Sequence, residues 1–513
     1  MNVYVCNVGS SLEAVVSGFW SLIDNYNLDI DRIVFVCSRD TCGFCDLLFR
    51  VFRVICPLVE DYGLIVVDEA DVYGSSCKII DFLRGEFGGS CNFIFDVTPG
   101  RKTMSISLFR VGLKFDCPVI YFHLKSNLFR GFVYPLIPRP LCRLEVIHGK
   151  LERFQSIEVD DFDNDYVRVP YRYLIAILNR LYSFGGSNFT VIVPYVNLRL
   201  FSFDYDDLSR VNIEFSDYQI RMINRYLSKF TYDYVYDSLL TSGLISPVNI
   251  DEVIGKIVNL IGERSCNLIL NPRQIALALD TNMLYLKIIS NYFIDRFNVP
   301  PLIVSSIVRS EIQRWIDRRL SSSEVARYLS YCKLINYPIN RARRLFNKLF
   351  SEDCRRAIIA LLELIELEKL NLVNYVYGEG VGDEALINNY SSLTDKFNLI
   401  LLTCDRGILN RALLAKLPAI LIEQRRSGDL KFNLNYGNLS RILYILSLYY
   451  GSIKISSGVF SFEFNGFWRD WNINDLGNGY IEVLIDPSNP VLRGLSGKFR
   501  VIGEVEKLLK EVG

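Results

Sequence analysis

The sequence contains very little histidine and carries no net charge. Only His123 and His148 occur among its 513 residues, which argues against a histidine-rich metal site and against a Ser-His-Asp triad. The 57 basic and 57 acidic residues balance to a formal charge of +0. Domains that bind nucleic acid over a broad surface are usually basic overall. Any contact with nucleic acid is therefore expected to be local.

Long apolar runs are also missing. No stretch reaches the ~18 uninterrupted apolar residues of a membrane-span candidate, and Ala357–Leu370 is broken by Glu363, Glu366, Glu368 and Lys369. The first residues lack the basic region of a secretory signal. These features predict a cytoplasmic protein without membrane contact.

The cysteines do not form a recognisable metal site. Thirteen are scattered through the chain, mostly within apolar runs, where a free thiol behaves as a small hydrophobic side chain. Only Cys42 and Cys45 have the spacing of a redox or metal pair, and no second pair completes a zinc site. We expect this pair to be structural, or a disulfide if the source is a hyperthermophile.

The length predicts two to four domains, and the first 150 residues alternate short apolar runs with amphipathic stretches. This alternation predicts a parallel α/β sheet with helices on both faces. The expected strands are Val3–Val8, Arg32–Cys37, Gly63–Val67, Asn92–Phe95 and Pro118–Phe122. The expected helices are Ser11–Tyr26, Asp46–Val54 and Ser75–Phe87.

The α/β rhythm returns in the second half of the chain. Expected strands there are Gln274–Leu279, Pro301–Ser305, Leu399–Thr403 and Ala419–Ile422. Expected helices are Met283–Phe297, Ser310–Leu320, Ser322–Lys348 and Asp353–Leu370. We therefore expect four segments: a Rossmann-like domain at 1–150, a mixed linker or transmitter at 151–265, a second α/β domain at 266–430, and a helix with a short β-rich extension at 431–513.

Four carboxylates follow strands of this second α/β domain, or open the helices after them: Asp280, Glu311, Asp383 and Asp405. In a parallel sheet these positions collect at one edge, where uncompensated charges would repel one another and raise their pKa values. Divalent cations are the natural counter-charge, and oxygen ligands select Mg²⁺ or Mn²⁺. Each single aspartate is equally well explained as a helix N-cap or a turn residue.

In order, spacing and context, Asp280-Thr281-Asn282, Ser310-Glu311, Gly382-Asp383 and Thr403-Cys404-Asp405-Arg406 resemble the PIN nuclease family over about residues 271–424. The resemblance implies that Asp280, Glu311, Asp383 and Asp405 are catalytic and hold the metal, with Asn282 and Thr403 in support. The third motif departs from the family because Asn388-Asn389-Tyr390 follows it, so Glu384 is an alternative to Asp383.

The N-terminal domain has its own constellation in the segment Phe93–Ser105, which reads as a strand, a tight Pro99-Gly100 turn and a helix start. Helix N-termini favour anions, and Arg101 and Lys102 add positive charge. The polar loops after the first two strands supply further hydroxyls. Neither Gly-x-Gly-x-x-Gly nor the P-loop pattern is present, so phosphate binding outside the NAD and ATP families is expected.

The pattern Asp96-x-Thr98-Pro99-Gly100-Arg101-Lys102-x-Met104 resembles the CRISPR-associated Rossmann fold (CARF) sensor family over about residues 1–148. The resemblance implies a homodimer that binds cyclic oligoadenylate, with cyclic tetraadenylate as the expected ring. The expected ligand-binding residues are Val8, Gly9, Ser10, Ser11, Ser38, Arg39, Thr98, Pro99, Gly100, Arg101, Lys102, Thr103 and Met104.

Taken together, the two resemblances predict an ancillary nuclease of type III CRISPR defence. It would be a cyclic oligoadenylate-activated, Mg²⁺- or Mn²⁺-dependent endonuclease that favours RNA, with DNA as a possible substrate. Two alternatives stay open: a non-catalytic regulator that senses the cyclic nucleotide, and a ring nuclease that degrades it.

Three weaker signals have simpler explanations. The acidic stretch around Asp161, Asp163 and Asp165 lacks the glycine and glutamate of an EF-hand and is expected to be a solvated linker. The alternating stripe Phe460–Phe464 suits one face of a packed hairpin better than a base-stacking surface. Gln424-Arg425-Arg426 is as well explained by an exposed loop as by an RNA contact.

Overall fold

The computed structural model describes residues 1–88, 91–152, 166–266, 274–316, 318–346, 350–424, 430–468, 471–485, 489, 492 and 494–511. The acidic stretch at 158–165 and the pair Arg425-Arg426 lie outside this description. The chain divides into two compact units. Unit 1 comprises Met1–Asp165, Arg172–Phe184 and Ile485–Gly513, and unit 2 comprises Tyr166–Tyr171 and Gly185–Leu484.

Unit 1 is built on a six-stranded sheet in the order β3-β2-β1-β4-β5-β6. Its first five strands are parallel, and β6 is antiparallel to β5. The strands are β1 (Asn2–Val8), β2 (Arg32–Cys37), β3 (Asp61–Val66), β4 (Asn92–Asp96), β5 (Val119–Leu124) and β6 (Cys142–His148). The expected parallel α/β sheet is confirmed, because β1, β2 and β4 are almost wholly buried, as strands covered on both faces must be.

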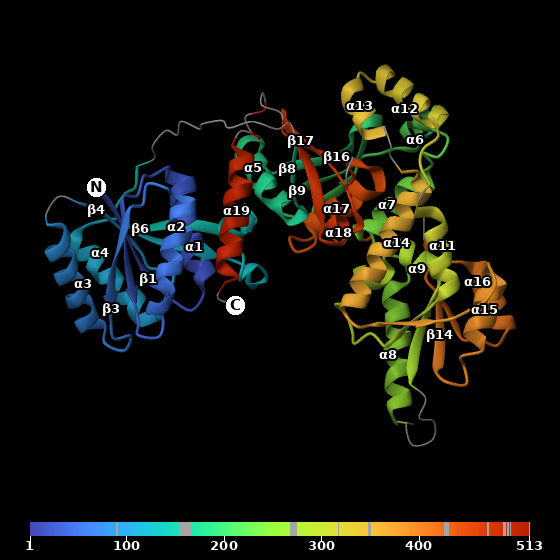
Figure 1. Ribbon diagram of the computed structural model, residues 1–513, viewed down its shortest axis with the longest axis horizontal. Helices are drawn as coiled ribbons and strands as arrows, with labels where there is room; N and C mark the ends of the chain where they lie inside the picture. Colours follow the sequence, from blue (N-terminus) through green and yellow to red (C-terminus); the bar gives the residue numbers. More distant parts are fainter. Residues whose placement is uncertain are drawn as a thin grey trace. The chain divides into compact units, whose positions relative to one another are not determined.

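The helices of unit 1 lie on both sides of this sheet (Figure 1). They are α1 (Leu12–Tyr26), α2 (Cys45–Ile55), α3 (Val72–Phe87), α4 (Lys102–Phe115), α5 (Leu174–Gly185) and α19 (Leu495–Leu509). The sequence did not predict α19, which returns to unit 1 from the C-terminus. It is tied there by ion pairs from Lys498 to Asp24 at 2.6 Å and from Arg50 to Glu511 at 3.0 Å. Cys42 and Cys45 are free thiols.

Unit 2 contains an antiparallel sheet in the order β10-β9-β8-β16-β17-β18-β7. Its strands are β7 (Tyr166–Pro170), β8 (Asn188–Val193), β9 (Leu198–Asp204), β10 (Val211–Ile213), β16 (Ser452–Ser457), β17 (Phe460–Asn465) and β18 (Tyr480–Leu484). The sheet therefore joins strands from the 151–265 segment with strands from the 431–513 extension. Phe462 and Phe464 are buried, which supports the packed-hairpin interpretation of the phenylalanine stripe.

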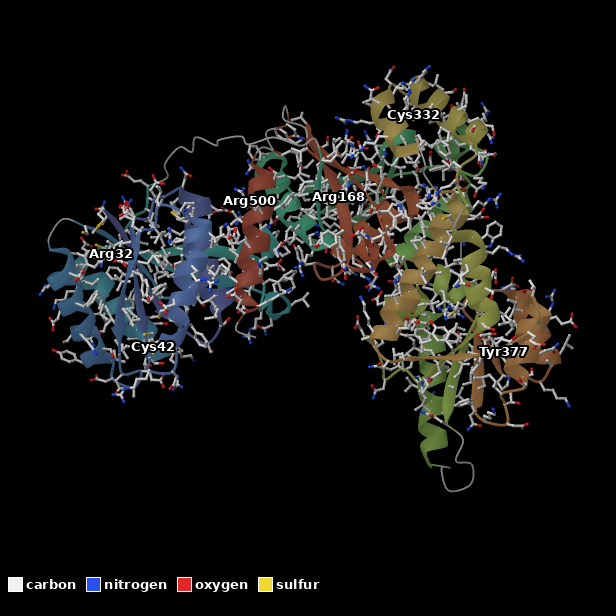
Figure 2. All side chains as sticks on the ribbon, in the orientation of Figure 1. Arg32, Cys42, Arg168, Cys332, Tyr377 and Arg500 are labelled. Carbon is white, nitrogen blue, oxygen red and sulfur yellow. The ribbon has the colours of Figure 1, made fainter. Side chains whose placement is uncertain are left out.

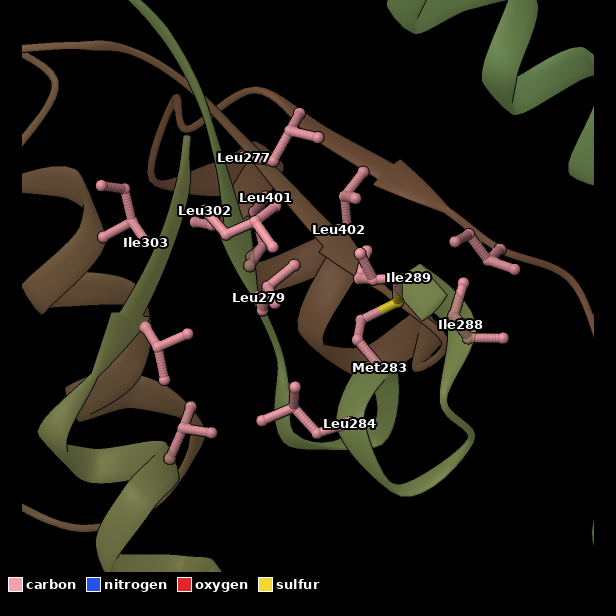
Figure 3. Packing of buried hydrophobic residues seen from close by; sticks show 14 of the residues in the cluster. Leu277, Leu279, Met283, Leu284, Ile288, Ile289, Leu302, Ile303, Leu401 and Leu402 are labelled. Carbon is pink, nitrogen blue, oxygen red and sulfur yellow. The ribbon is translucent and has the colours of Figure 1, made fainter. Parts of the chain in front are cut away.

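The second sheet of unit 2 is parallel, in the order β13-β12-β11-β14-β15. Its strands are β11 (Ile275–Leu279), β12 (Leu302–Ser305), β13 (Val373–Val376), β14 (Asn398–Thr403) and β15 (Ala419–Leu421). Four of these were predicted, and the short, half-exposed β13 was not. Leu277, Leu279, Leu401 and Leu402 pack with Met283 in the core of this sheet (Figure 3).

The helices of unit 2 surround these two sheets. They are α6 (Asp217–Asn224), α7 (Tyr232–Ser242), α8 (Ile250–Cys266), α9 (Thr281–Tyr285), α10 (Ile288–Tyr292), α11 (Ser306–Ile316), α12 (Ser322–Leu334), α13 (Ile339–Phe346), α14 (Glu352–Lys369), α15 (Asp383–Ser391), α16 (Arg406–Leu414), α17 (Leu439–Tyr450) and α18 (Ile473–Gly477). Among the described residues, no helix is long and apolar enough to cross a membrane.

Three helix predictions were wrong in detail. The expected helix Met283–Phe297 is broken at Lys287, which takes a left-handed φ of 50°. The expected helix Ser322–Lys348 is divided into α12 and α13, because Asn336 has a left-handed φ of 56° and Pro338 cannot continue a helix. The helix expected at Ser310–Leu320 begins earlier, so Glu311 lies in its second turn instead of opening it.

The break at Lys287 buries a charge. The Lys287 Nζ lies 2.6 Å from Glu363 and 3.0 Å from Glu366, and the side chains of Lys287 and Glu363 are 2% and 0% exposed. Ser290 donates to Glu363 through its backbone amide at 2.9 Å and its hydroxyl at 2.5 Å. The carboxylate is therefore fully hydrogen-bonded, as a buried charge must be.

We expect Lys287→Met to destabilise unit 2 by about 3–5 kcal/mol, because it leaves Glu363 buried without its cation. The measurement is urea denaturation followed by circular dichroism. The control is Lys256→Met, which breaks an exposed pair with Glu252 on α8 and should cost less than about 1 kcal/mol. Equal losses in the two variants would contradict this account of the helix break.

Candidate functional site

A pocket of about 480 Å³ lies at the carboxyl ends of the unit 1 strands. Strands β1 and β4 are neighbours there although β2 and β3 lie between them in sequence, so this is the point where the strand order reverses. Open α/β sheets bind ligands at such points. The lining residues are Val8, Gly9, Ser10, Ser11, Ala14, Ser38, Asp40, Thr41, Phe44, Glu69, Thr98, Pro99, Gly100, Arg101 and Met104.

Two helices begin at this pocket without a side-chain cap. The N-cap residues are Ser11 for α1 and Arg101 for α4, and neither accepts a hydrogen bond from its own helix. In contrast, Asp71 caps α3 by accepting from the Gly74 amide. The uncapped first-turn amides keep their partial positive charge. The pocket is therefore suited to an anion such as a phosphate.

Two glycines allow the pocket loops to touch. A Cβ on Gly9 would lie 2.7 Å from the Gly100 backbone nitrogen, and a Cβ on Gly100 would lie 3.0 Å from Asn7 Cβ. Gly100 also has a φ of 92°, which side-chain-bearing residues rarely adopt. The contact between the β1 and β4 loops therefore requires glycine on both sides.

Asp96, at the end of β4, holds the loop that follows this strand. Its carboxylate is fully buried and accepts hydrogen bonds from the Tyr4 hydroxyl at 2.5 Å and the Thr98 amide at 2.8 Å. Burial raises the pKa of Asp96, while the hydrogen bonds from Thr98 and Tyr4 oppose that rise. A Cβ on Gly18 would lie 2.1 Å from this carboxylate, so α1 approaches it closely. Asp96 thus anchors the turn instead of facing the pocket.

The structure brings most of the predicted ligand-binding residues together, with three exceptions. Arg39, Lys102 and Thr103 do not line the pocket. The Thr103 hydroxyl donates to the Glu69 backbone oxygen, and Arg101, which does line it, forms a 2.6 Å ion pair with Glu69. Thr41, Phe44 and Glu69 line the pocket but were not predicted. Thr41 and Phe44 follow β2 and Glu69 follows β3, and this position after a strand could have identified them from the sequence. Ligand binding by these residues stays a prediction.

In unit 2, Asp280 occupies the carboxyl end of the central strand β11. It is 3% exposed and accepts hydrogen bonds from the Thr403 hydroxyl at 2.9 Å and the Asn282 side-chain amide at 3.3 Å. The sequence had placed both residues in support of this carboxylate, and the structure shows the contacts. Tyr390, which was not predicted, donates to the Leu279 carbonyl and accepts from the Ser305 amide, so it ties β11 to β12 beside Asp280.

The other three carboxylates lie after neighbouring strands of the same sheet. Glu311, on α11 after β12, accepts a hydrogen bond from the Thr281 hydroxyl at 2.7 Å. Asp405, after β14, caps α16 by accepting from the Gly407 amide at 2.5 Å. Asp383 opens α15 and forms a 2.6 Å ion pair with Arg411.

The structure does not gather these carboxylates into a ready metal centre. Within the described ranges, no group of three or more His, Cys, Asp or Glu residues is placed to hold a metal ion. Asp280 and Glu311 are close enough for the charge of Glu311 to raise the pKa of Asp280. Their oxygen donors suit a hard divalent cation, whereas Asp383 is engaged by Arg411 and Asp405 by its helix.

Burial raises the pKa of Asp280 to about 6, although the bonds from Thr403 and Asn282 oppose the rise. An unfolded aspartate titrates near pH 3.9, so the folded state holds this proton more tightly. The contribution of the protonated Asp280 carboxyl to the free energy of unfolding is complete below about pH 4, and it is lost as the pH rises through about 6. When no cation is bound, the buried carboxylate is therefore charged above pH 6 and costs stability.

We expect Asp280→Asn to be more stable than the wild type above pH 6 in the presence of a chelator, by at most about 3 kcal/mol. Urea denaturation of both proteins between pH 4 and 8 measures the difference, which should be smallest at pH 4. Asp295→Asn, at an exposed position of unit 2, is the control and should show no such trend. A difference that does not vary with pH would contradict the raised pKa.

Comparison with known proteins gives only distant similarities. No family model matches the chain, and no curated protein matches it. Can2 from Sulfobacillus thermosulfidooxidans, solved in complex with cyclic tetra-adenylate, is 12% identical, with 86% of this chain and 98% of that chain covered and a TM-score of 0.26. Protein VC1899 from Vibrio cholerae is 13% identical, with 82% and 93% covered and a TM-score of 0.24.

A third solved structure is Csm6 from Enterococcus italicus bound to cyclic hexa-2'-fluoro-hexa-dAMP. It is 10% identical, with 66% of this chain and 63% of that chain covered and a TM-score of 0.22. At such identities and TM-scores, the function has to be inferred from the two sites themselves.

Proposed function

We propose that the chain is an endonuclease, with RNA as the favoured substrate, that a cyclic oligoadenylate activates as part of type III CRISPR defence. The observation that carries the proposal is the pocket of unit 1, in which two uncapped helix N-termini meet at the strand-order reversal. It is supported by the carboxylates of unit 2 at the equivalent edge of the parallel sheet. The CARF-like and PIN-like motifs fall at these two edges.

In the sensor, the uncapped amides of α1 and α4 bind phosphates of the ring, and the hydroxyls of Ser10, Ser11 and Ser38 contact its sugars. Arg101 exchanges its ion pair with Glu69 for a phosphate oxygen. A cavity of about 480 Å³ lies in the usual range for small-molecule pockets, and a ring of four nucleotides extends beyond one such cavity. We therefore propose that two copies of the chain share the ring as a homodimer.

In the nuclease, Asp280, Glu311, Asp383 and Asp405 would hold Mg²⁺ or Mn²⁺, and such an ion would supply activation of a water and stabilisation of the leaving oxygen of a phosphodiester. Thr403 and Asn282 orient the Asp280 carboxylate, and Thr281 orients Glu311. Asp383 breaks its ion pair with Arg411 and joins the other three carboxylates. This rearrangement is the step that ligand binding favours, provided that the ring binds the active arrangement more tightly than the resting one.

We expect Mn²⁺ to raise the thermal unfolding temperature of the wild type at pH 8 but not that of Asp280→Asn. A bound ion at 100 times its Kd adds about 2.7 kcal/mol to stability, and the carboxylate of Asp280 is ionised at this pH. Differential scanning fluorimetry with EDTA and with increasing Mn²⁺ measures the effect, with Asp295→Asn as control. Equal shifts in wild type and Asp280→Asn would contradict metal binding by Asp280.

A second candidate is a non-catalytic regulator that senses the cyclic nucleotide. It is favoured by one observation, the Asp383–Arg411 ion pair, which keeps this carboxylate away from the others. The experiment that separates the two is incubation of labelled RNA and DNA with the full chain and Mn²⁺, with and without cyclic tetraadenylate. Ligand-dependent cleavage supports the nuclease, and ligand binding without cleavage supports the regulator.

A further inference from the structure

Positive charge is concentrated in one segment of this neutral chain, and the segment begins next to the candidate active site. Residues 306–346, which contain α11, α12 and α13, hold nine Arg or Lys residues against three Asp or Glu residues. Eight of the nine basic residues are exposed: Arg309, Arg314, Arg318, Arg319, Arg327, Lys333, Arg343 and Arg344. We call these exposed cations the basic ridge.

Part of this charge has a structural explanation. Arg344 forms a 2.9 Å ion pair with Glu482 of the antiparallel sheet, and Arg318 lies 3.3 Å from Asp353 on α14. In the part of the chain that the structure describes, no ion pair or hydrogen bond is found for the side chains of Arg314, Arg327, Lys333 or Arg343. Arg327 interacts with Glu324 only through its charge, and none of the four forms a direct ion pair, so they are available to an anionic partner.

The basic ridge begins at the carboxylate edge. Helix α11 starts at Ser306, directly after β12, and carries Glu311 in its second turn. Its eleven residues span about 16 Å, and a short connection then leads to α12 and α13, which pack against each other (Figure 1). A polyanion that follows the ridge therefore reaches the carboxylates of the proposed nuclease.

An exposed aromatic side chain marks the same edge. Tyr377 follows β13 at the surface of unit 2 and is 79% exposed (Figure 2). Its loop is held rigidly, because the Ser306 hydroxyl donates to the Gly378 carbonyl and accepts from the Gly378 amide, both at 3.0 Å. Asn389 also donates to the Tyr377 carbonyl at 2.8 Å. The tyrosine is thus fixed beside the first turn of α11 with its ring free in solvent.

We infer that the basic ridge and Tyr377 form a binding track for single-stranded nucleic acid, with phosphates on Arg314, Arg327, Lys333 and Arg343 and a base stacked on Tyr377. Phosphate contacts supply affinity without sequence preference, and a stacked aromatic ring requires an unpaired base. The inference rests on the proposed nuclease function and specifies its substrate as a single strand instead of a duplex.

The phosphate contacts are tested by fluorescence anisotropy of a labelled single-stranded RNA with the full chain, cyclic tetraadenylate and EDTA. We expect Arg314→Gln/Arg327→Gln/Arg343→Gln to weaken binding about tenfold and to reduce the salt slope by about 2, since each lost single-strand contact contributes about 0.7. The matched control is Arg84→Gln/Arg130→Gln/Arg500→Gln, at exposed arginines of unit 1. Equal effects of the two triple variants would overturn the inference, as would no binding by the wild type.

The stacking contact is tested with single-stranded and duplex RNA of equal length. We expect Tyr377→Ala to weaken single-strand binding about tenfold, Tyr377→Phe to restore it, and neither variant to change duplex binding. Tyr218→Ala, at a tyrosine that is 72% exposed on α6, is the control and should bind like the wild type. Unchanged binding by Tyr377→Ala, or an equal loss with duplex, would overturn the assignment to a single strand.

These binding assays contain no metal, so their outcome is independent of cleavage. If the wild type binds RNA through the ridge but never cuts it, the nuclease proposal fails and the binding track stands. If the wild type cuts RNA and the Arg314→Gln/Arg327→Gln/Arg343→Gln variant has the same KM, the track fails and the nuclease stands.

Discussion

Replacing Asp280 with Asn is expected to lower the rate of ligand-activated RNA cleavage at least about a thousandfold. The amide keeps the shape of the buried side chain but removes the charge that holds the metal, whose contribution to such reactions is several kcal/mol. A loss of about 4 kcal/mol corresponds to this factor. Single-turnover cleavage with Mn²⁺ and saturating cyclic tetraadenylate measures it.

Asp405→Asn is the companion variant, because asparagine also caps helices and α16 should stay intact. We expect a loss of about a hundredfold for this residue, since it is exposed and contributes one ligand at the rim of the site. Asp295→Asn is the control for a lost surface carboxylate in unit 2 and should cut at the wild-type rate. Cleavage that survives both Asp280→Asn and Asp405→Asn would exclude the carboxylates from catalysis.

The second large effect is expected from Gly100→Ala, which should abolish activation by the cyclic ligand while leaving basal cleavage unchanged. The added Cβ would lie 3.0 Å from the Asn7 Cβ. In addition, alanine rarely adopts a φ of 92°. The β1 and β4 loops must then separate, which displaces the uncapped amide groups that we assign to the phosphates. Isothermal titration with cyclic tetraadenylate, followed by the cleavage assay, measures both losses.

Gly85→Ala provides the control, because this glycine of α3 has no atom within 4 Å of an added Cβ. It should bind the ligand and be activated like the wild type. Normal activation of Gly100→Ala would show that the loop contact is not part of the sensor. Loss of basal cleavage in the same variant would indicate a general folding defect instead of a lost signal.

The sequence predicted the parallel strands well because they are buried on both faces and appear as short runs of Val, Ile, Leu and Phe. Strands β1, β2, β4, β11 and β14 all have this character. It did not predict β13 or α19. The first is a half-exposed edge strand without a continuous apolar run, and the second owes its place to contacts with residues more than 400 positions away.

The candidate sites show the same division between local and non-local information. The pocket residues at 8–11, 38 and 98–101 could be predicted because each follows a strand. The ion pair between Glu69 and Arg101 could not, since it depends on how β3 lies in the sheet. The Asp383–Arg411 pair likewise arises from packing between α15 and α16, so the engagement of this carboxylate could not be predicted.

The net charge of the whole chain does not indicate the basic ridge. A formal charge of +0 for the whole chain argued against a broad nucleic-acid surface, but it averages the positive residues 306–346 with acidic residues elsewhere. Which of these cations are free of ion pairs depends on the approach of Glu482 and Asp353, which is non-local.

A cyclic ligand bound in unit 1 is expected to control phosphodiester cleavage in unit 2. The most direct test is the ratio of RNA cleavage rates with and without cyclic tetraadenylate, measured for the full chain with Mn²⁺. A coupling free energy of about 1–3 kcal/mol predicts a ratio of about 5–150, which Gly100→Ala should reduce to one. A wild-type ratio of one, with the ligand shown to be bound, would contradict the claim.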